Sequence, residues 1–170
     1  MDQQHRALEA VFQSVSPTMR DREPAPGRWS VAGTIEHVAI VENRVAHRLS
    51  TQIAEARGKG LGPELDRSPV IPTLPIAPLF NRTTKLTAPN AVQPTGVSAA
   101  VAWENLEDAD QRIRDVLIES DNLALGTLTM AHPAFGHQSF YYWFAFIGAH
   151  KARHAAQIEE IKQELAIVDC

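Results

Sequence analysis

Hydrophobic residues recur at steps of three and four in four stretches of the chain, a spacing that places them on one face of an α-helix. The first predicted helix covers about residues 2–19, and the second begins after a Ser30 cap and ends near residue 57. The third begins at Ser98 and ends near residue 120, and the fourth covers about residues 139–167. No segment shows a convincing strand-like alternation. The pattern predicts an all-α protein.

The same spacing assigns faces to the two central helices. In the second helix, Glu42, Asn43, Arg44 and Glu55 fall on the side away from the apolar positions, so we expect solvent there. The third helix should turn five apolar side chains inward: Val101, Leu106, Ile113, Val116 and Leu117.

The segment between the second and third helices, about residues 60–97, is rich in proline. It holds seven of the eleven prolines, which excludes a continuous helix. Several of its large apolar side chains need burial, so we expect an ordered, extended connection across the body of the domain. These side chains are Val70, Ile71, Leu74, Ile76, Leu79 and Phe80.

Four helices of this length predict a four-helix bundle. The connection over residues 60–97 is long enough to run along the bundle, so the second and third helices can be parallel neighbours in an up-down-down-up order. At 170 residues the chain has the size of one domain, and we expect residues 1–170 to form a single bundle.

Composition narrows the classes of partner. With 44% hydrophobic and 21% charged residues the chain is globular, and a net charge of −4 does not favour nucleic acid or an anionic membrane. The uncharged run 140–149 is far below the roughly 18 residues that span a bilayer. The polar start does not resemble a signal peptide. The single cysteine, Cys170, allows no intrachain disulfide, so we expect a cytoplasmic protein.

Two of the seven histidines, His150 and His154, lie four residues apart in the fourth helix. That spacing separates them by about 40° and about 6 Å, so both imidazoles project from one face, among apolar residues. They are either core histidines bonded to carbonyls or water, or two ligands of one metal ion. Lys151 stands where zinc peptidases of the His-Glu-x-x-His type carry their glutamate, which argues against that class.

A third ligand is needed for a metal site, and His37 in the second helix is the best candidate. It lies beside the apolar positions, about two turns after Ser30. Taken alone, His37 would be interpreted as a histidine at the helix flank with a local hydrogen bond. Three histidines on two facing helices favour a metal-binding site instead. Its neighbour Glu36 can orient an imidazole or carry a proton, although an angle of about 100° from His37 favours surface exposure.

The other four histidines are expected at the surface or in loops. His5 is near the terminus, and His47 lies among polar residues of the second helix. His132 and His137 flank a turn, where each can support a ligand, contact a substrate or be a plain loop residue.

Aromatic residues gather just before the histidine pair. Seven of the eleven fall within residues 135–146, too many for one bundle to bury by itself. The remainder can line an apolar pocket or form a dimer interface, and we favour the dimer.

Three motifs together resemble the DinB-like superfamily. They are Trp29-Ser30-Val31-Ala32 followed by Ile35-Glu36-His37-Val38-Ala39; His132-Pro133-x-Phe135-Gly136; and Phe144-x3-Gly148-Ala149-His150-x3-His154-x2-Gln157-Ile158. The resemblance implies an up-down-down-up four-helix bundle, often a homodimer. It also implies a divalent metal, usually nickel or zinc, with iron or manganese possible, held by His37, His150 and His154. The proline-rich stretch and Lys151, where relatives often carry an acid, depart from the family pattern.

Relatives with a known activity include thiol-dependent S-transferases and a thiol-dependent isomerase. We therefore expect a metal-dependent enzyme, either a thiol-dependent S-transferase or a hydrolase, acting on a small molecule. Cys170 is the terminal residue, so the sulfur would come from a low-molecular-weight thiol. The alternative is a non-catalytic module that binds metal, dimerises or binds a small molecule.

Overall fold

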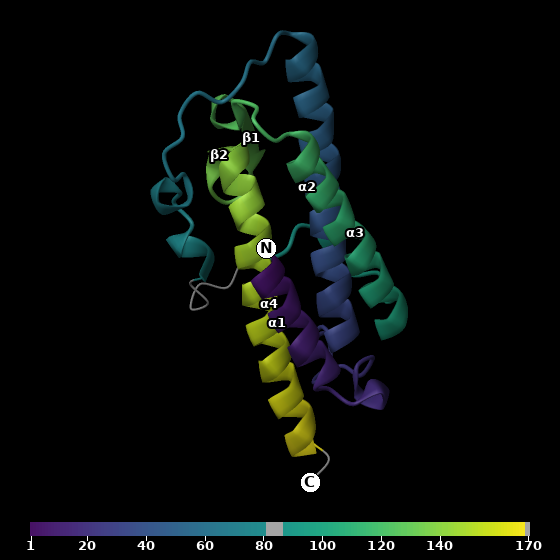
Figure 1. Cartoon of the computed structure of the whole chain (residues 1–170). Helices are drawn as coiled ribbons and strands as arrows, with labels where there is room; N and C mark the ends of the chain where they lie inside the picture. Colours follow the sequence, from purple (N-terminus) through teal and green to yellow (C-terminus); the bar gives the residue numbers. More distant parts are fainter. Residues whose placement is uncertain (81–86, 169–170) are drawn as a thin grey trace.

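Four α-helices build the molecule in a computed structural model that describes residues 1–80 and 87–168 (Figure 1). They are α1 (Asp2–Gln13), α2 (Val31–Gly58), α3 (Ala99–Glu119) and α4 (Phe140–Val168). Two short strands, β1 (Thr129–His132) and β2 (Gly136–Ser139), form a hairpin before α4. Short 3-10 turns lie between these elements: η1 (Pro17–Met19), η2 (Ile71–Thr73), η3 (Ala77–Phe80), η4 (Asn90–Val92) and η5 (Leu125–Thr127). The all-α four-helix bundle is confirmed.

Contacts between helix ends give the helix directions. Arg57 near the end of α2 donates to the carbonyl of Glu119 at the end of α3, so these two helices run parallel. Lys162 of α4 donates to Ser14 just after α1 at 3.0 Å, while Met1 lies against Gly148, so α1 and α4 are parallel as well. The two pairs run in opposite directions, which is the expected up-down-down-up order.

Serine caps begin α2 and α3 as the sequence predicts. The Ser30 hydroxyl accepts the Gly33 N–H at 3.0 Å, and Ser98 accepts the Val101 N–H at 3.5 Å. The predicted end of the first helix near residue 19 was wrong, because α1 stops at Gln13. Pro17 has no N–H to donate to a preceding turn and instead begins the separate 3-10 turn η1.

The prediction of no strands was also wrong. In β1 and β2, Met130 pairs with Gln138 and His132 with Gly136. Each strand has four residues, and among them Met130 alone is buried, so no alternation is long enough to be read from the sequence. The hairpin is fixed to α4, since Trp143 donates its indole N–H to the Met130 carbonyl at 3.2 Å.

Most of the aromatic residues near the start of α4 are buried within the chain itself. Phe140, Tyr142, Trp143, Phe144 and Phe146 are each at most 7% exposed, whereas Phe135 and Tyr141 are partly buried. The expectation that one bundle cannot bury these rings was therefore wrong for five of the seven. The hairpin and the proline-rich connection add cover that four helices alone do not provide, because Leu79 is buried in the same cluster and Leu74 and Ile76 pack against it.

Several predicted faces were wrong in detail. Val101 and Leu117 of α3 are each 42% exposed, because the buried stripe instead follows Ala99, Ala102, Leu106, Ala109, Ile113 and Val116. Three of the buried residues on this face are alanines. The prediction chose the larger Val101 and Leu117, each one position away from a buried residue. In the connection, Leu79 is buried as expected, whereas Ile71 and Phe80 are exposed. Among the described residues, no helix is both long and apolar enough to cross a membrane.

Candidate metal centre

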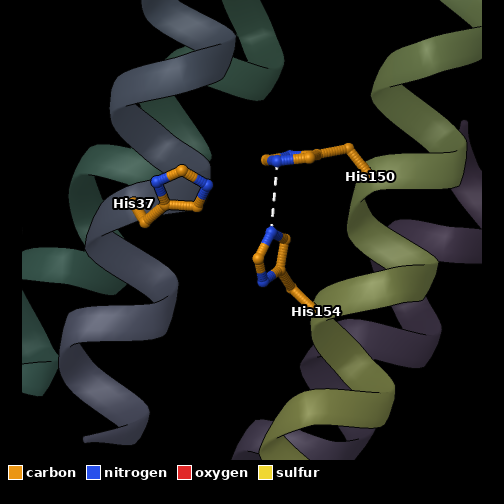
Figure 2. Close-up of side chains that lie close together, drawn as sticks. All are labelled: His37, His150 and His154. Atoms are coloured by element: carbon orange, nitrogen blue, oxygen red, sulfur yellow. Dashed lines mark hydrogen bonds between the residues drawn. The ribbon is translucent and has the colours of Figure 1, made fainter. Parts of the chain in front are cut away.

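Three imidazoles converge between α2 and α4. His37 comes from α2, and His150 and His154 come from successive turns of α4 (Figure 2). Ring centroids lie 5.2 Å apart for His37 and His150, 4.9 Å for His37 and His154, and 4.4 Å for His150 and His154. One nitrogen from each ring lies within 4.8 Å of the other two. The structure thus brings together the three residues selected from the sequence.

Hydrogen bonds at the outer side of two rings fix where their protons lie. Nδ1 of His37 donates to the Val92 carbonyl at 2.7 Å, and Nδ1 of His154 donates to Oε1 of Gln157 at 2.9 Å. Because both partners are oxygens that only accept, each Nδ1 carries the proton. Each Nε2 then presents a lone pair, which is the form of histidine that binds metals.

His150 faces His154 with the two Nε2 atoms 3.1 Å apart. If His150 donates from Nε2, its Nδ1 keeps a lone pair that is buried with no hydrogen-bond partner among the described residues. A proton on Nδ1 would instead place two Nε2 lone pairs against each other. Two nitrogens bound to one ion at about 2.0–2.1 Å lie about 3.3 Å apart in tetrahedral geometry. The pair therefore fits a shared cation with little adjustment.

Burial favours the neutral form of two of these imidazoles. Burial lowers the pKa of His37, and the hydrogen bond to Val92 opposes it only in part. Burial also lowers the pKa of His150 well below its usual value, and the neighbouring His154 and His37 add to the effect. Since metals bind the neutral imidazole, the surroundings favour the binding form of His37 and His150.

Aromatic rings surround the cluster. The ring of Trp29 lies 4.9 Å from His37, and Phe146 stacks on His150 at 5.1 Å. His132 of β1 is half-buried and its ring lies 5.2 Å from Phe146, so it packs beside the ring that stacks on His150 and is not part of the three-histidine cluster. His137 and His47 are exposed, as expected.

His5 departs from its predicted surface position. It is only 8% exposed, its ring lies 5.9 Å from Trp103, and its Nε2 lies 3.1 Å from a carboxylate oxygen of Glu107. It is on the face of α1 that packs against α3, so its closeness to the terminus does not expose it.

Glu36 was wrongly expected at the surface, since it is 4% exposed. Its carboxylate accepts from the N–H of Thr95 at 2.8 Å, the hydroxyl of Thr95 at 2.6 Å, and the N–H groups of Gly96 and Val97 at 3.0 and 3.3 Å. Burial by itself raises the pKa of Glu36, but these hydrogen bonds lower it below its usual value. The end of the proline-rich connection covers this side of α2, which helical angles alone do not reveal.

A buried ionic cluster lies beside the histidines, and sequence reasoning missed it. Lys151 is fully buried, with Nζ bonded to Asp110 and 3.3 Å from Oε2 of Glu42. Glu42, expected in solvent, is 0% exposed, and burial raises its pKa to about 8 against the pull of Lys151. Asp110 also accepts from Arg114 at 2.6 Å, so we assign the negative charge of the cluster to Asp110. The sequence offered one signal for this cluster, a lysine beside His150 in an otherwise apolar part of the helix.

A separate groove lies away from the three histidines. A groove of about 580 Å³ between α2 and α3 is lined by residues that include Arg44, His47 and Arg112, and it does not reach the three histidines. His37 and His154 are 5% and 7% exposed, whereas His150 is only partly buried.

Comparisons with known proteins agree with the fold. A family model described as the DinB superfamily matches residues 1–158. The uncharacterized protein YuaE of Bacillus subtilis (strain 168) is 24% identical over 162 residues, which cover 91% of this chain and 90% of that protein. The crystal structure of TT2238, a four-helix bundle protein, superposes with a TM-score of 0.57 at 18% identity and covers 94% of this chain and 92% of that one.

Proposed function

The chain belongs to the DinB superfamily, and on that premise we propose that His37, His150 and His154 bind a divalent metal and that the protein is a metal-dependent enzyme acting on a small molecule. The observation that carries the proposal is the convergence of three imidazoles from two helices, two of them with their lone pairs fixed toward a common point. Nickel or zinc is the proposed metal, with iron or manganese as alternatives, since imidazole suits all of these.

The number of candidate ligands supports a metal site with a coordination position left for a substrate or water. Among the described residues, the histidine cluster includes no fourth histidine, cysteine or carboxylate. Three protein ligands are the number found in catalytic zinc sites, where structural sites have four. A bound cation would lower the pKa of a thiol or water that reaches it. The chain's own residues would hold the ligands neutral and exclude bulk water through Phe146 and Trp29.

Within this proposal, the reaction is thiol-dependent S-transfer or hydrolysis. The resemblance to thiol-dependent transferases favours S-transfer, in which a carbon–sulfur bond forms as the leaving group departs from the electrophile. The thiol would be a low-molecular-weight co-substrate. Cys170, the protein's own sulfhydryl, lies outside the described residues.

A non-catalytic module is the second candidate, and the burial of the site favours it. Two of the three histidines, His37 and His154, are buried, and the groove between α2 and α3 lies apart from them. A metal held there would tie α2 to α4 without meeting a substrate. Turnover that depends on the histidines separates the two candidates.

The test is elemental analysis of the purified protein beside a His150→Ala/His154→Ala variant. We expect metal in the wild type and its loss in the variant. A His47→Ala/His137→Ala variant, which removes two exposed histidines, is the matched control and should keep the metal. Equal metal content in wild type and the His150/His154 variant would contradict the site. Assays with bacillithiol, mycothiol and glutathione against an aryl halide, and with water against an aryl ester, then test for turnover.

A homodimer is also part of the proposal, and it rests on the family resemblance alone. The aromatic cluster that first favoured it is covered within one chain. Light scattering of the purified protein should give twice the 18.7 kDa mass of one chain. A monomer at micromolar concentration would contradict it.

A further inference from the structure

The last part of the proline-rich connection lies directly against the metal-ligand helix. Residues 92–97 pass over α2 at the turn that carries Glu36 and His37. We call residues 92–97 the strap. The carbonyl of Val92, at its start, accepts the Nδ1 proton of His37 at 2.7 Å. The orientation of this ring therefore depends on where the strap is held.

The carboxylate of Glu36 holds the other end of the strap. Both of its oxygens are used, one by Thr95 and the other by the N–H groups of Gly96 and Val97. Hydrogen bonds to an ionised acceptor are roughly twice as strong as neutral ones. Because Glu36 is 4% exposed, water competes little for them. One side chain thus fixes three successive residues of the strap.

A glycine turn sets the course of the strap beside α2. At Gly33 the strap passes so near that an added Cβ would make an ordinary van der Waals contact with Pro94, at 3.5 Å. Gly96 has a φ of +93°, which side chains other than glycine rarely adopt, and this turn directs its N–H toward Glu36. The strap then leads directly into the Ser98 cap of α3.

We propose that Glu36 is a positioning residue: its carboxylate fixes the strap across α2 so that the Val92 carbonyl holds His37 with Nε2 toward His150 and His154. Figure 2 shows one ring nitrogen of His37 facing the two histidines of α4. The inference rests on the proposed metal site for its functional consequence. The arrangement of strap and ring is a property of the protein without metal.

The experiment compares the wild type with Glu36→Gln. Glutamine keeps the size of the side chain but turns an NH2 group toward backbone N–H donors, so it cannot serve both ends of the carboxylate. The control is Glu55→Gln, the same change at an exposed position of α2. Thr95→Val removes only the 2.6 Å hydroxyl bond and serves as a milder variant if Glu36→Gln fails to fold.

Three measurements follow at one fixed pH. In metal-free protein, nitrogen NMR of the His37 ring reports its tautomer, and hydrogen exchange reports the N–H groups of Gly96 and Val97. Zinc affinity is then measured by competition with a chelating dye. We expect Glu36→Gln to mix the His37 tautomers and to speed hydrogen exchange in the strap. We also expect it to weaken zinc binding about 10- to 100-fold, the usual effect of disturbing the hydrogen-bond partner of a metal ligand. Glu55→Gln should match the wild type.

The proposal is overturned if exchange in the strap speeds up while the His37 tautomer and the zinc affinity stay unchanged. It is overturned equally if Glu36→Gln and Glu55→Gln behave alike. If the wild type binds no zinc, the proposed metal site fails, and the tautomer of His37 in metal-free protein still decides the role of Glu36.

Discussion

Lys151→Met should destabilise the protein strongly although it alters no proposed metal ligand. Lys151 and Glu42 are fully buried, and the side chain of Asp110 is 6% exposed. Removing the ammonium leaves a buried carboxylate without its closest cation. Breaking a buried pair from one side costs about 3–5 kcal/mol.

The lower end of that range applies here. Asp110 keeps its 2.6 Å bond to Arg114, and Glu42, with its pKa near 8, is largely neutral at pH 7. We therefore expect a loss of about 3 kcal/mol in the free energy of unfolding. In a domain of this size that is a fall of roughly 6–12 °C in Tm. Adding Asp110→Asn removes the carboxylate charge that Lys151 helps to balance, so the two changes should couple by about 0.5–3 kcal/mol.

The assay is urea unfolding followed by far-UV circular dichroism at pH 7 with a chelator present, so that metal binding does not contribute. Lys162→Met is the matched control, because Lys162 lies on the same helix with its side chain 38% exposed. It should change stability by no more than about 0.5 kcal/mol. If Lys151→Met stays within about 1 kcal/mol of the wild type, or the double variant is less stable than the single, the argument from the buried charge is refuted.

Three further predictions concern pH, metal and capping. Because burial depresses the pKa values of His37 and His150, these two side chains should contribute stability to the metal-free protein above pH 6.5 and lose that contribution as the pH falls. Glu42, with its pKa raised to about 8, acts in the opposite direction, so the measurement is the difference between wild type and His150→Gln in urea titrations across pH. Zinc at 100 times its Kd should add about 2.7 kcal/mol, seen as a higher Tm that His37→Ala abolishes. Ser30→Ala removes the cap of α2 and should cost about 1 kcal/mol by urea unfolding, whereas Ser30→Gly should cost only a few tenths.

The sequence was enough to predict the helices and the grouping of the three histidines because these depend on local spacing. Ser30 and Ser98 begin helices through a bond three residues away, and His150 and His154 share a face by helical geometry. His37 was found by its position beside the apolar face of a second helix. Each of these signals lies within a few residues of chain.

The residues whose burial was predicted wrongly or missed are buried by partners that are distant in the chain. Glu36 is buried by residues 59 to 61 positions away, and Lys151 is neutralised by Asp110, 41 positions away. Helical angles describe one helix and its solvent face, but the other face of α2 is covered by the strap and by α3. The hairpin escaped notice because strands of four residues give too few positions to reveal a period.

The anchoring of the strap divides the long connection into two parts with different tolerance to change. Residues 92–97 are held by Glu36 and His37, whereas residues 64–69 are mostly exposed and lie far upstream of that anchor. Doubling the length of a flexible loop costs only about 0.6 kcal/mol. Insertions near Pro69, or new chain ends created there by circular permutation, should therefore leave the histidine cluster undisturbed. The same segment offers a place to graft a recognition loop or a reporter domain.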